Sequence, residues 1–161
     1  MNFQAGDVVM HWTHGLGKII RLEKRDLFGR QALYYAVRVG DMTVWVPADE
    51  KLRIRLRPPT SKAQFRRLLA TLSEPAQALP ADRHERKLLL VDLLKDGRAE
   101  SLCRVISGLA AYRHVHSLND NDQAMLRRVQ SALLAEWGHV LAVTPAQAEV
   151  QLHRLLDTAA A

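Results

Sequence analysis

The 161-residue sequence contains one cysteine, Cys103, and this scarcity excludes two classes of small protein. One thiol can form neither an intramolecular disulfide framework nor a cysteine-rich zinc site. Cys103 lies between Leu102 and Val105 in a pattern with helical spacing. We therefore expect a buried structural thiol and not a nucleophile.

Long hydrophobic runs are also absent. No apolar segment approaches the length that crosses a membrane, and no basic N-terminal region precedes an apolar stretch. These absences predict a cytoplasmic protein that has no membrane as a partner.

The sequence also lacks a recognisable catalytic or metal-binding pattern. His114 and His116 have the spacing of two metal ligands, but no third ligand lies near them in the sequence. Residues 15–18 (Gly-Leu-Gly-Lys) are followed by neither Ser nor Thr and lead into a strand pattern, unlike a phosphate-binding loop. No nucleophile stands beside a base, and we expect His14 to satisfy a turn by hydrogen bonding. We therefore expect a protein that is not an enzyme and has neither a cofactor nor a small-molecule substrate.

Acidic residues are outnumbered, with 17 Asp and Glu against 23 Lys and Arg, so the formal net charge is +6. This balance favours an anionic partner. No acid occurs between Lys51 and Ser73. Such a run is commonly a solvated face, but its length makes contact with phosphates or with an acidic protein more credible. Its basic residues are Lys51, Arg53, Arg55, Arg57, Lys62, Arg66 and Arg67.

The N-terminal part, up to about Arg57, has the pattern of a small β-domain. Short β-branched and aromatic runs predict four strands, at 8–10, 18–22, 33–39 and 43–46. Turn residues separate them, at 15–17, 28–30 and 40–41. Strands this short and this tightly joined favour an antiparallel barrel that closes its own edges. Over 51–57, alternating basic and apolar residues predict a last strand with one basic face.

After Pro58 and Pro59 the pattern becomes helical. Thr60 or Ser61 caps a first helix, and residues 73–80 read as a linker. Further helices are predicted over 82–95, over 99–114, after a cap at Asn119 and after a capping box at 144–147. We thus expect an α+β protein with a small antiparallel barrel over 1–57, a connecting helix and linker over 58–80, and an all-helical domain over 81–161.

The motifs of the N-terminal part resemble one known family. They are Phe3-x-x-Gly6-Asp7-x-Val9, His14-Gly15, Thr43-Val44-x-Val46-Pro47 and Leu56-Arg57. With the helical domain that follows, the chain is similar over essentially its full length to the CarD/CdnL-type bacterial transcription regulators. The resemblance implies a Tudor-like barrel that binds a lobe of the RNA polymerase β subunit. It also implies that the helical domain touches promoter DNA at the upstream edge of the melted bubble and alters open-complex stability without sequence-specific recognition.

The resemblance implies particular contacts with the polymerase. Arg25 aligns with an arginine that family members use there, and Trp45 aligns with a second contact arginine. Arg21 and Lys24 cluster with Arg25 in the sequence and complete the expected polymerase-binding set.

Trp45 has two possible placements, because strand alternation puts it on the face opposite Val44 and Val46. It is either exposed, which would suggest an interface, or packed under the following helix.

On the DNA side, Arg83 aligns with the tryptophan that family members place against the minor groove. An apolar wedge unstacks bases, whereas an arginine reads the negative potential of the groove. Basic residues near a helix N-terminus are unfavourable for the helix dipole, which suggests that they serve a partner. The expected DNA-binding set is Arg83, Arg86, Lys87, Arg127 and Arg128.

Two other functions stay open. The protein could be an adaptor that docks on the polymerase without productive DNA contact, or a general basic module that binds RNA or DNA without the polymerase. Polymerase binding without a DNA footprint would indicate the first. Salt-sensitive binding to bare duplex would indicate the second.

Overall fold

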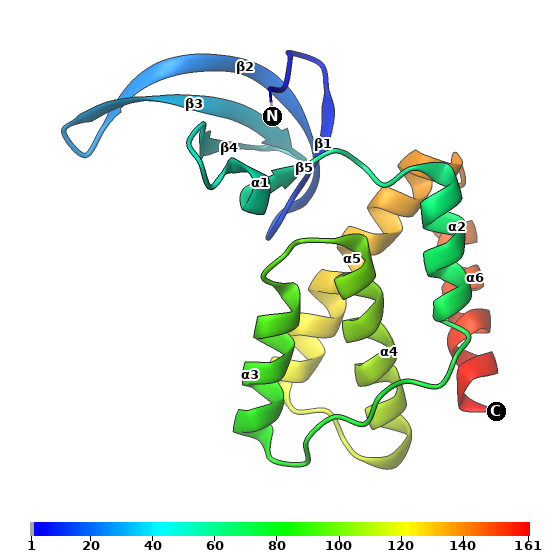
Figure 1. The fold of residues 1–161 in the computed structure, drawn as a ribbon. Coiled ribbons are helices and arrows are strands. Elements are labelled where there is room, and N and C mark those ends of the chain that lie inside the picture. The colour runs from blue at the N-terminus through cyan, green and yellow to red at the C-terminus, as the bar shows by residue number, and fades with distance from the viewer. Residues whose placement is uncertain (1) are drawn as a thin grey trace. The chain divides into compact units, whose positions relative to one another are not determined.

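The computed structural model describes residues 2–161, and the chain divides into two compact units, Met1–Pro59 and Thr60–Ala161 (Figure 1). The first unit is a β-sheet with one short helix, and the second is built of helices. The expected α+β class, with strands preceding an all-helical region, is confirmed.

The N-terminal unit is an antiparallel sheet with the strand order β4-β3-β2-β1-β5. Its strands are β1 (Val8–His11), β2 (Gly15–Leu27), β3 (Arg30–Val39), β4 (Met42–Pro47) and β5 (Leu56–Arg57). Figure 1 shows β2 and β3 as long, strongly curved strands. Among residues 2–161, no ladder joins β4 to β5, so the sheet is barrel-like but open where we expected it to close.

The hairpin of β2 and β3 is longer than the sequence predicted. Its ladder continues to the pair Leu27 and Arg30, and Phe28 and Gly29 form the two-residue turn between them. Both turn residues have positive φ, 56° and 76°, as a primed hairpin turn requires. The strand prediction stopped early because the residues toward the turn are mainly polar, and they pair through their backbone.

The core of this unit lies on one face of the sheet. It consists of Val9, Ile19, Tyr35, Val37, Val46, Leu52 and Leu56. Phe3 places the edge of its ring against Tyr35, 5.8 Å between centroids, so the opening motif covers this core. Gly17 is needed because an added Cβ would lie 2.9 Å from the Arg38 carbonyl oxygen.

The prediction of a strand over 51–57 was wrong for most of its length. Residues Leu52–Arg55 form the short helix α1, and only Leu56 and Arg57 pair with β1. Leu52 and Leu56 are 6% and 1% exposed, whereas Ile54 is 53% exposed. Apolar residues at 52, 54 and 56 fit the alternation of a strand. The two buried ones, Leu52 and Leu56, lie four residues apart, which is also the spacing of one helix face.

The C-terminal unit contains five helices among the described residues. They are α2 (Lys62–Thr71), α3 (Arg83–Leu94), α4 (Ala99–Val115), α5 (Asp120–Leu141) and α6 (Pro145–Ala160). The caps follow the sequence closely: Ser61, Asp82, Asn119 and Thr144 each accept a backbone hydrogen bond, and the last two form capping boxes. No helix within residues 2–161 is long and apolar enough to cross a membrane.

Helix α2 packs into this unit. Phe65 is fully buried and lies 6.2 Å, centroid to centroid, from the buried Trp137 of α5. Cys103 is buried in the same core, as expected, and burial raises the pKa of its thiol to about 12.

Candidate functional sites

The face of the sheet opposite the core, which we call the outer face, carries Trp45 next to two arginines. The strand register places Arg21, Ala36 and Trp45 in one row across β2, β3 and β4. The Arg25 guanidinium carbon lies 4.0 Å from the Trp45 ring centroid, and that of Arg21 lies 5.5 Å away. These distances are those of cation–π contacts.

The structure decides between the two placements of Trp45. Its neighbour Val46 is buried in the core together with Leu52 of α1, so α1 covers the face that Val46 occupies. Successive strand residues point to opposite faces, so Trp45 lies on the outer face, where it is half-buried. The two arginines pack over the Trp45 ring, and the following helix does not.

Glu23 fixes these two arginines. Its Oε2 accepts from Arg21 Nε at 2.7 Å, and its Oε1 accepts from Arg25 Nη1 at 3.3 Å. The hydrogen bond from Arg21, with further help from Arg25, holds the pKa of Glu23 below its ordinary value. Glu23 was not predicted, although the spacing Arg-x-Glu-x-Arg on one strand places all three side chains on one face. We call Arg21, Glu23, Arg25 and Trp45 the aromatic–arginine face.

Lys24 does not belong to this face. It is exposed and lies between Glu23 and Arg25 in β2, so its side chain points to the opposite side of the sheet. The structure therefore brings together three of the four expected polymerase-binding residues, Arg21, Arg25 and Trp45, and separates the fourth from them.

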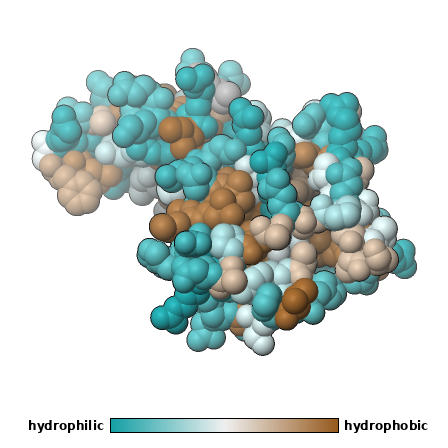
Figure 2. Space-filling view, turned by 60° about the horizontal axis from the view of Figure 1, so that its bottom comes forward, coloured by the Kyte–Doolittle hydropathy of each residue, from teal (hydrophilic) through white to brown (hydrophobic). Residues whose placement is uncertain are grey.

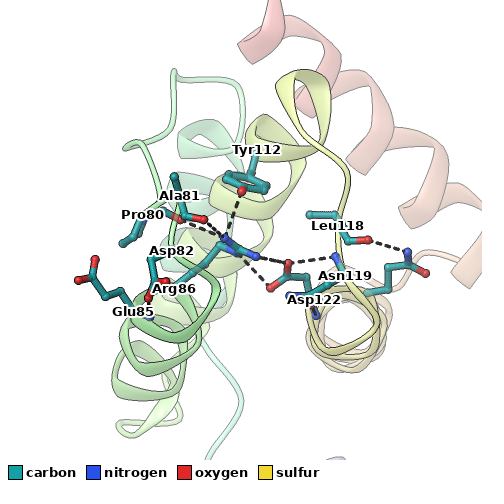
Figure 3. Close-up of polar contacts among 10 residues, drawn as sticks. Pro80, Ala81, Asp82, Glu85, Arg86, Tyr112, Leu118, Asn119 and Asp122 are labelled. Atoms are coloured by element: carbon teal, nitrogen blue, oxygen red, sulfur yellow. Dashed lines mark hydrogen bonds and ion pairs between the residues drawn. The ribbon is translucent and has the colours of Figure 1, made fainter.

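Arg86, which we expected to contact DNA, is instead buried, with 3% of its side chain exposed. Figure 3 shows its guanidinium enclosed by groups from the segment before α3, from α4 and from α5. It donates to both Asp122 carboxylate oxygens, at 2.8 Å from Nη2 and 3.2 Å from Nε. Nη1 donates to the carbonyls of Pro80 and Ala81 and to the Tyr112 hydroxyl, each at 3.1 Å. The hydrogen bond to Asp122 raises the pKa of Arg86.

This burial corrects the expectation for Arg86. Its position in the first turn of α3, among charged residues, indicated a surface side chain. The tertiary structure supplies a carboxylate, two carbonyls and an aromatic ring, which together satisfy the guanidinium away from water. Arg86 is therefore a positioning residue and presents no cation to a partner.

The Arg86 contacts bring together the start of α3, the end of α4 and the start of α5 (Figure 3). This end of the helical unit is rich in basic residues. The exposed cations within about two helical turns of the network are Arg83, Lys87, Arg113, Arg127 and Arg128. We call these five residues the basic end; they include the four expected DNA-binding residues other than Arg86.

A solvent-open concavity of about 480 Å³ lies between the end of α4 and the start of α5. Arg113 and Arg127 line it together with polar side chains, among them His116, Gln123 and Gln130. Within residues 2–161, no carboxylate forms an ion pair with Arg113 or Arg127. Two unpaired guanidiniums in a polar hollow can bind a phosphate group. The expected DNA-binding set did not include Arg113, because the loop that turns α4 back onto α5 and brings Arg113 beside Arg127 was not predictable in detail.

The turn after β1 is satisfied by His11, and not by His14 as we expected. The His11 Nδ1 accepts backbone N–H bonds from Thr13 and from His14, each at 3.1 Å. Burial, and then the nearby His14, lower the pKa of His11 to about 4. The ring is therefore neutral at pH 7, with its proton on Nε2, and its role in this turn is structural.

Comparison with known proteins gives a family match for the N-terminal unit. Residues 3–58 match the family model described as the CarD-like/TRCF RID domain. Over 147 residues the chain is 23% identical to a protein of Bacillus subtilis (strain 168) named "Putative transcription factor YdeB". That alignment covers 90% of this chain and 96% of the relative, so the similarity extends through both units. The resemblance to the CarD/CdnL-type regulators is thereby confirmed.

Proposed function

We propose that this chain, whose N-terminal unit is a CarD-like/TRCF RID domain, binds the β subunit of RNA polymerase and modulates the stability of open promoter complexes. The domain match and the curated relative support a transcription-related role that involves RNA polymerase. The β-subunit contact, the DNA contacts and the effect on promoter opening are our proposals. In this role the protein would work in the bacterial cytoplasm, at the nucleoid.

The observation that carries the proposal is the aromatic–arginine face within the matched domain. A half-buried tryptophan on the outer face of a strand, covered by two arginines, offers both apolar area and charge to a partner. Tryptophan and arginine are the residue types that most often dominate binding energy at protein interfaces. Glu23 holds the guanidiniums in place, so less side-chain entropy is lost on binding.

For the DNA side, we propose that Arg83, Lys87, Arg113, Arg127 and Arg128 contact the phosphate backbone without reading sequence. All five are exposed at one end of the helical unit, which the Arg86–Asp122 pair holds together. Backbone contacts of this kind provide affinity and orientation but carry no sequence information. This matches a regulator that acts without sequence-specific recognition.

A binding titration against a purified polymerase β-subunit lobe fragment tests the polymerase contact. We expect saturable binding that Arg25→Glu weakens at least ten-fold, because the reversed charge faces the partner and repels Glu23. The matched control is Arg53→Glu, an exposed arginine of α1 in the same unit, which should bind like the wild type. Equal loss in both variants would indicate a general charge effect and not a defined surface.

The same preparation separates the two other candidate functions. Binding to the fragment without any DNA footprint on a promoter complex would indicate a docking adaptor. Salt-sensitive binding to bare duplex with no affinity for the fragment would indicate a general nucleic-acid-binding module. The arginines of the basic end that have no carboxylate partner within residues 2–161 favour DNA contact over the adaptor.

A further inference from the structure

We propose that Phe28, at the tip of the β2–β3 hairpin, is an apolar anchor that inserts into an apolar pocket bordered by acidic groups on the polymerase surface. This inference rests on the proposed function, because it extends the same partner contact. It adds a residue for which the motifs gave no signal.

The ring of Phe28 is fully exposed, with a relative accessibility of 101%, the highest among the exposed large hydrophobic side chains. It therefore buries no area in the fold and adds no packing energy to it. Scattered exposed apolar residues are common on proteins, but a wholly exposed phenylalanine on a protruding turn is not. Figure 2 shows that brown, hydrophobic atoms also surface elsewhere among the teal ones, so exposure alone does not carry the proposal.

The backbone at Phe28 is the second observation. Its φ of 56° lies in the left-handed region, where a bulky side chain is disfavoured. Asparagine, aspartate or glycine is the usual first residue of such a two-residue hairpin turn. Phe28 thus occupies a position where a smaller residue would suit the fold better. Its ring buries no area in the fold that would offset the backbone strain.

The position of the tip indicates the partner. Phe28 follows Arg25 by three residues along the hairpin, a distance of roughly 10 Å in a strand. A protein interface of ordinary size covers about 800 Å² on each partner. A patch of that area is wide enough to include both Arg25 and Phe28. Contact through the aromatic–arginine face therefore brings the tip to the same partner.

The neighbours of Phe28 define the chemistry of the pocket. Leu22 and Leu33, on the face of the hairpin opposite Arg25, are 48% and 43% exposed, so apolar surface also continues along that other face. Arg21, Lys24, Arg25 and Arg30 lie along this end of the hairpin and outnumber its two acids, Asp26 and Glu23, which pairs with Arg21 and Arg25. The hairpin therefore offers an apolar ring within a net positive rim, and it fits an apolar pocket with an acidic border.

The test compares Phe28→Asn, Phe28→Tyr and Ile54→Asn in the titration with the β-lobe fragment, using the full chain. Asparagine suits the left-handed turn, so Phe28→Asn should leave the melting temperature unchanged or raise it. We expect it to weaken binding at least ten-fold. Phe28→Tyr retains the ring and should bind within about two-fold of the wild type. Ile54→Asn removes an exposed apolar residue of the same unit away from the hairpin, and it should also bind like the wild type.

Salt distinguishes the anchor from its charged neighbours. The loss caused by Phe28→Asn should be the same at low and high salt, whereas the loss caused by Arg25→Glu should shrink as salt rises. Fragment binding that Phe28→Asn leaves unchanged, while Arg25→Glu weakens it, would overturn the anchor and leave the proposed function standing. No binding by the wild type would overturn both. Loss of self-association in Phe28→Asn, without loss of fragment binding, would assign the ring to a second copy of the chain and overturn the proposal.

Discussion

Arg86 and Asp122 form an ion pair sealed inside the helical unit, with 2.8 Å between Nη2 and Oδ2 and side-chain exposures of 3% and 1%. Removal of one partner from such a pair leaves a buried charge without compensation. Asp122 also closes the capping box of α5, because it accepts from the Asn119 backbone N–H at 3.3 Å. The pair therefore couples the start of α5 to α3.

We expect Asp122→Ala to lower the free energy of unfolding of the helical unit by about 3–5 kcal/mol, because Arg86 would stay buried without its carboxylate. Urea unfolding followed by far-ultraviolet circular dichroism measures this, since the helices dominate that signal. The control is Glu100→Ala, which breaks the exposed pair with Arg104 and should cost less than about 1 kcal/mol. A similar small loss for Asp122→Ala would mean that the pair is not buried in solution.

The buried His11 predicts a pH dependence for the β-unit. Its folded pKa, about 4, lies below its ordinary value of 6.5, so the unfolded chain binds the proton more tightly. The contribution of neutral His11 is therefore fully present above pH 6.5 and is lost as the pH falls toward 4. Between pH 7.5 and pH 5 we expect a loss of about 2 kcal/mol from this group.

The measurement is the difference between the wild type and His11→Gln in thermal unfolding of the β-unit at these two pH values. Glutamine can accept a hydrogen bond but does not titrate, so the variant should lose less stability on acidification. Parallel pH profiles for the two proteins would contradict the role of His11 in the turn.

We expect a small substitution at Gly17 to lower the free energy of unfolding of the β-unit markedly. An added Cβ would lie 2.9 Å from both the Arg38 carbonyl oxygen and Val37 Cγ1. The backbone of β3 must move to relieve such a contact, so Gly17→Ala should destabilise the β-unit by about 1–3 kcal/mol. Differential scanning calorimetry of the variant tests this. Gly6→Ala is an informative comparison, because Gly6 has open space around its Cβ position but a φ of 93°, so its cost comes from backbone strain alone.

The concavity at the basic end predicts a change in salt dependence. If Arg113 and Arg127 each neutralise a phosphate, their joint replacement by alanine should reduce the slope of log affinity against log salt by about 2 for duplex DNA. Fluorescence anisotropy with a labelled duplex at several salt concentrations gives the slope. Arg104→Ala in α4, whose arginine is paired with Glu100, should leave the slope unchanged. An unchanged slope in the double variant would remove the concavity from the DNA surface.

Much of the fold was predictable because its signals are local. Ser61, Asn119 and Thr144 cap helices where the sequence placed caps, and the turn at Phe28-Gly29 lies within the predicted turn at 28–30. These features depend on a few neighbouring residues and on backbone hydrogen bonds. The segment at 51–57 was misassigned because apolar residues at 52, 54 and 56 are compatible with a strand, while Leu52 and Leu56 alone fit a helical turn.

The candidate sites were predictable only in part. The resemblance selected Arg25 and Trp45 as contact residues. The structure places them on one face, with 4.0 Å between the Arg25 guanidinium carbon and the Trp45 ring centroid. It could not show that Glu23 holds Arg25, or that Lys24 points to the other side of the sheet. Both follow from strand alternation once β2 is known to continue through Leu27, but the predicted strand ended at residue 22.

The sequence by itself determined the order of the four long strands and of the five long helices, the helix caps and the motifs of the N-terminal domain, because each depends on short-range chemistry. Only the tertiary structure decided which charges are available to a partner. Arg86 and Arg83 lie in the same turn of α3, yet one is sealed against Asp122 and the other faces solvent. The difference arises because burial of a charge requires a partner from a distant segment, here 36 residues away, and only folding brings that partner into contact.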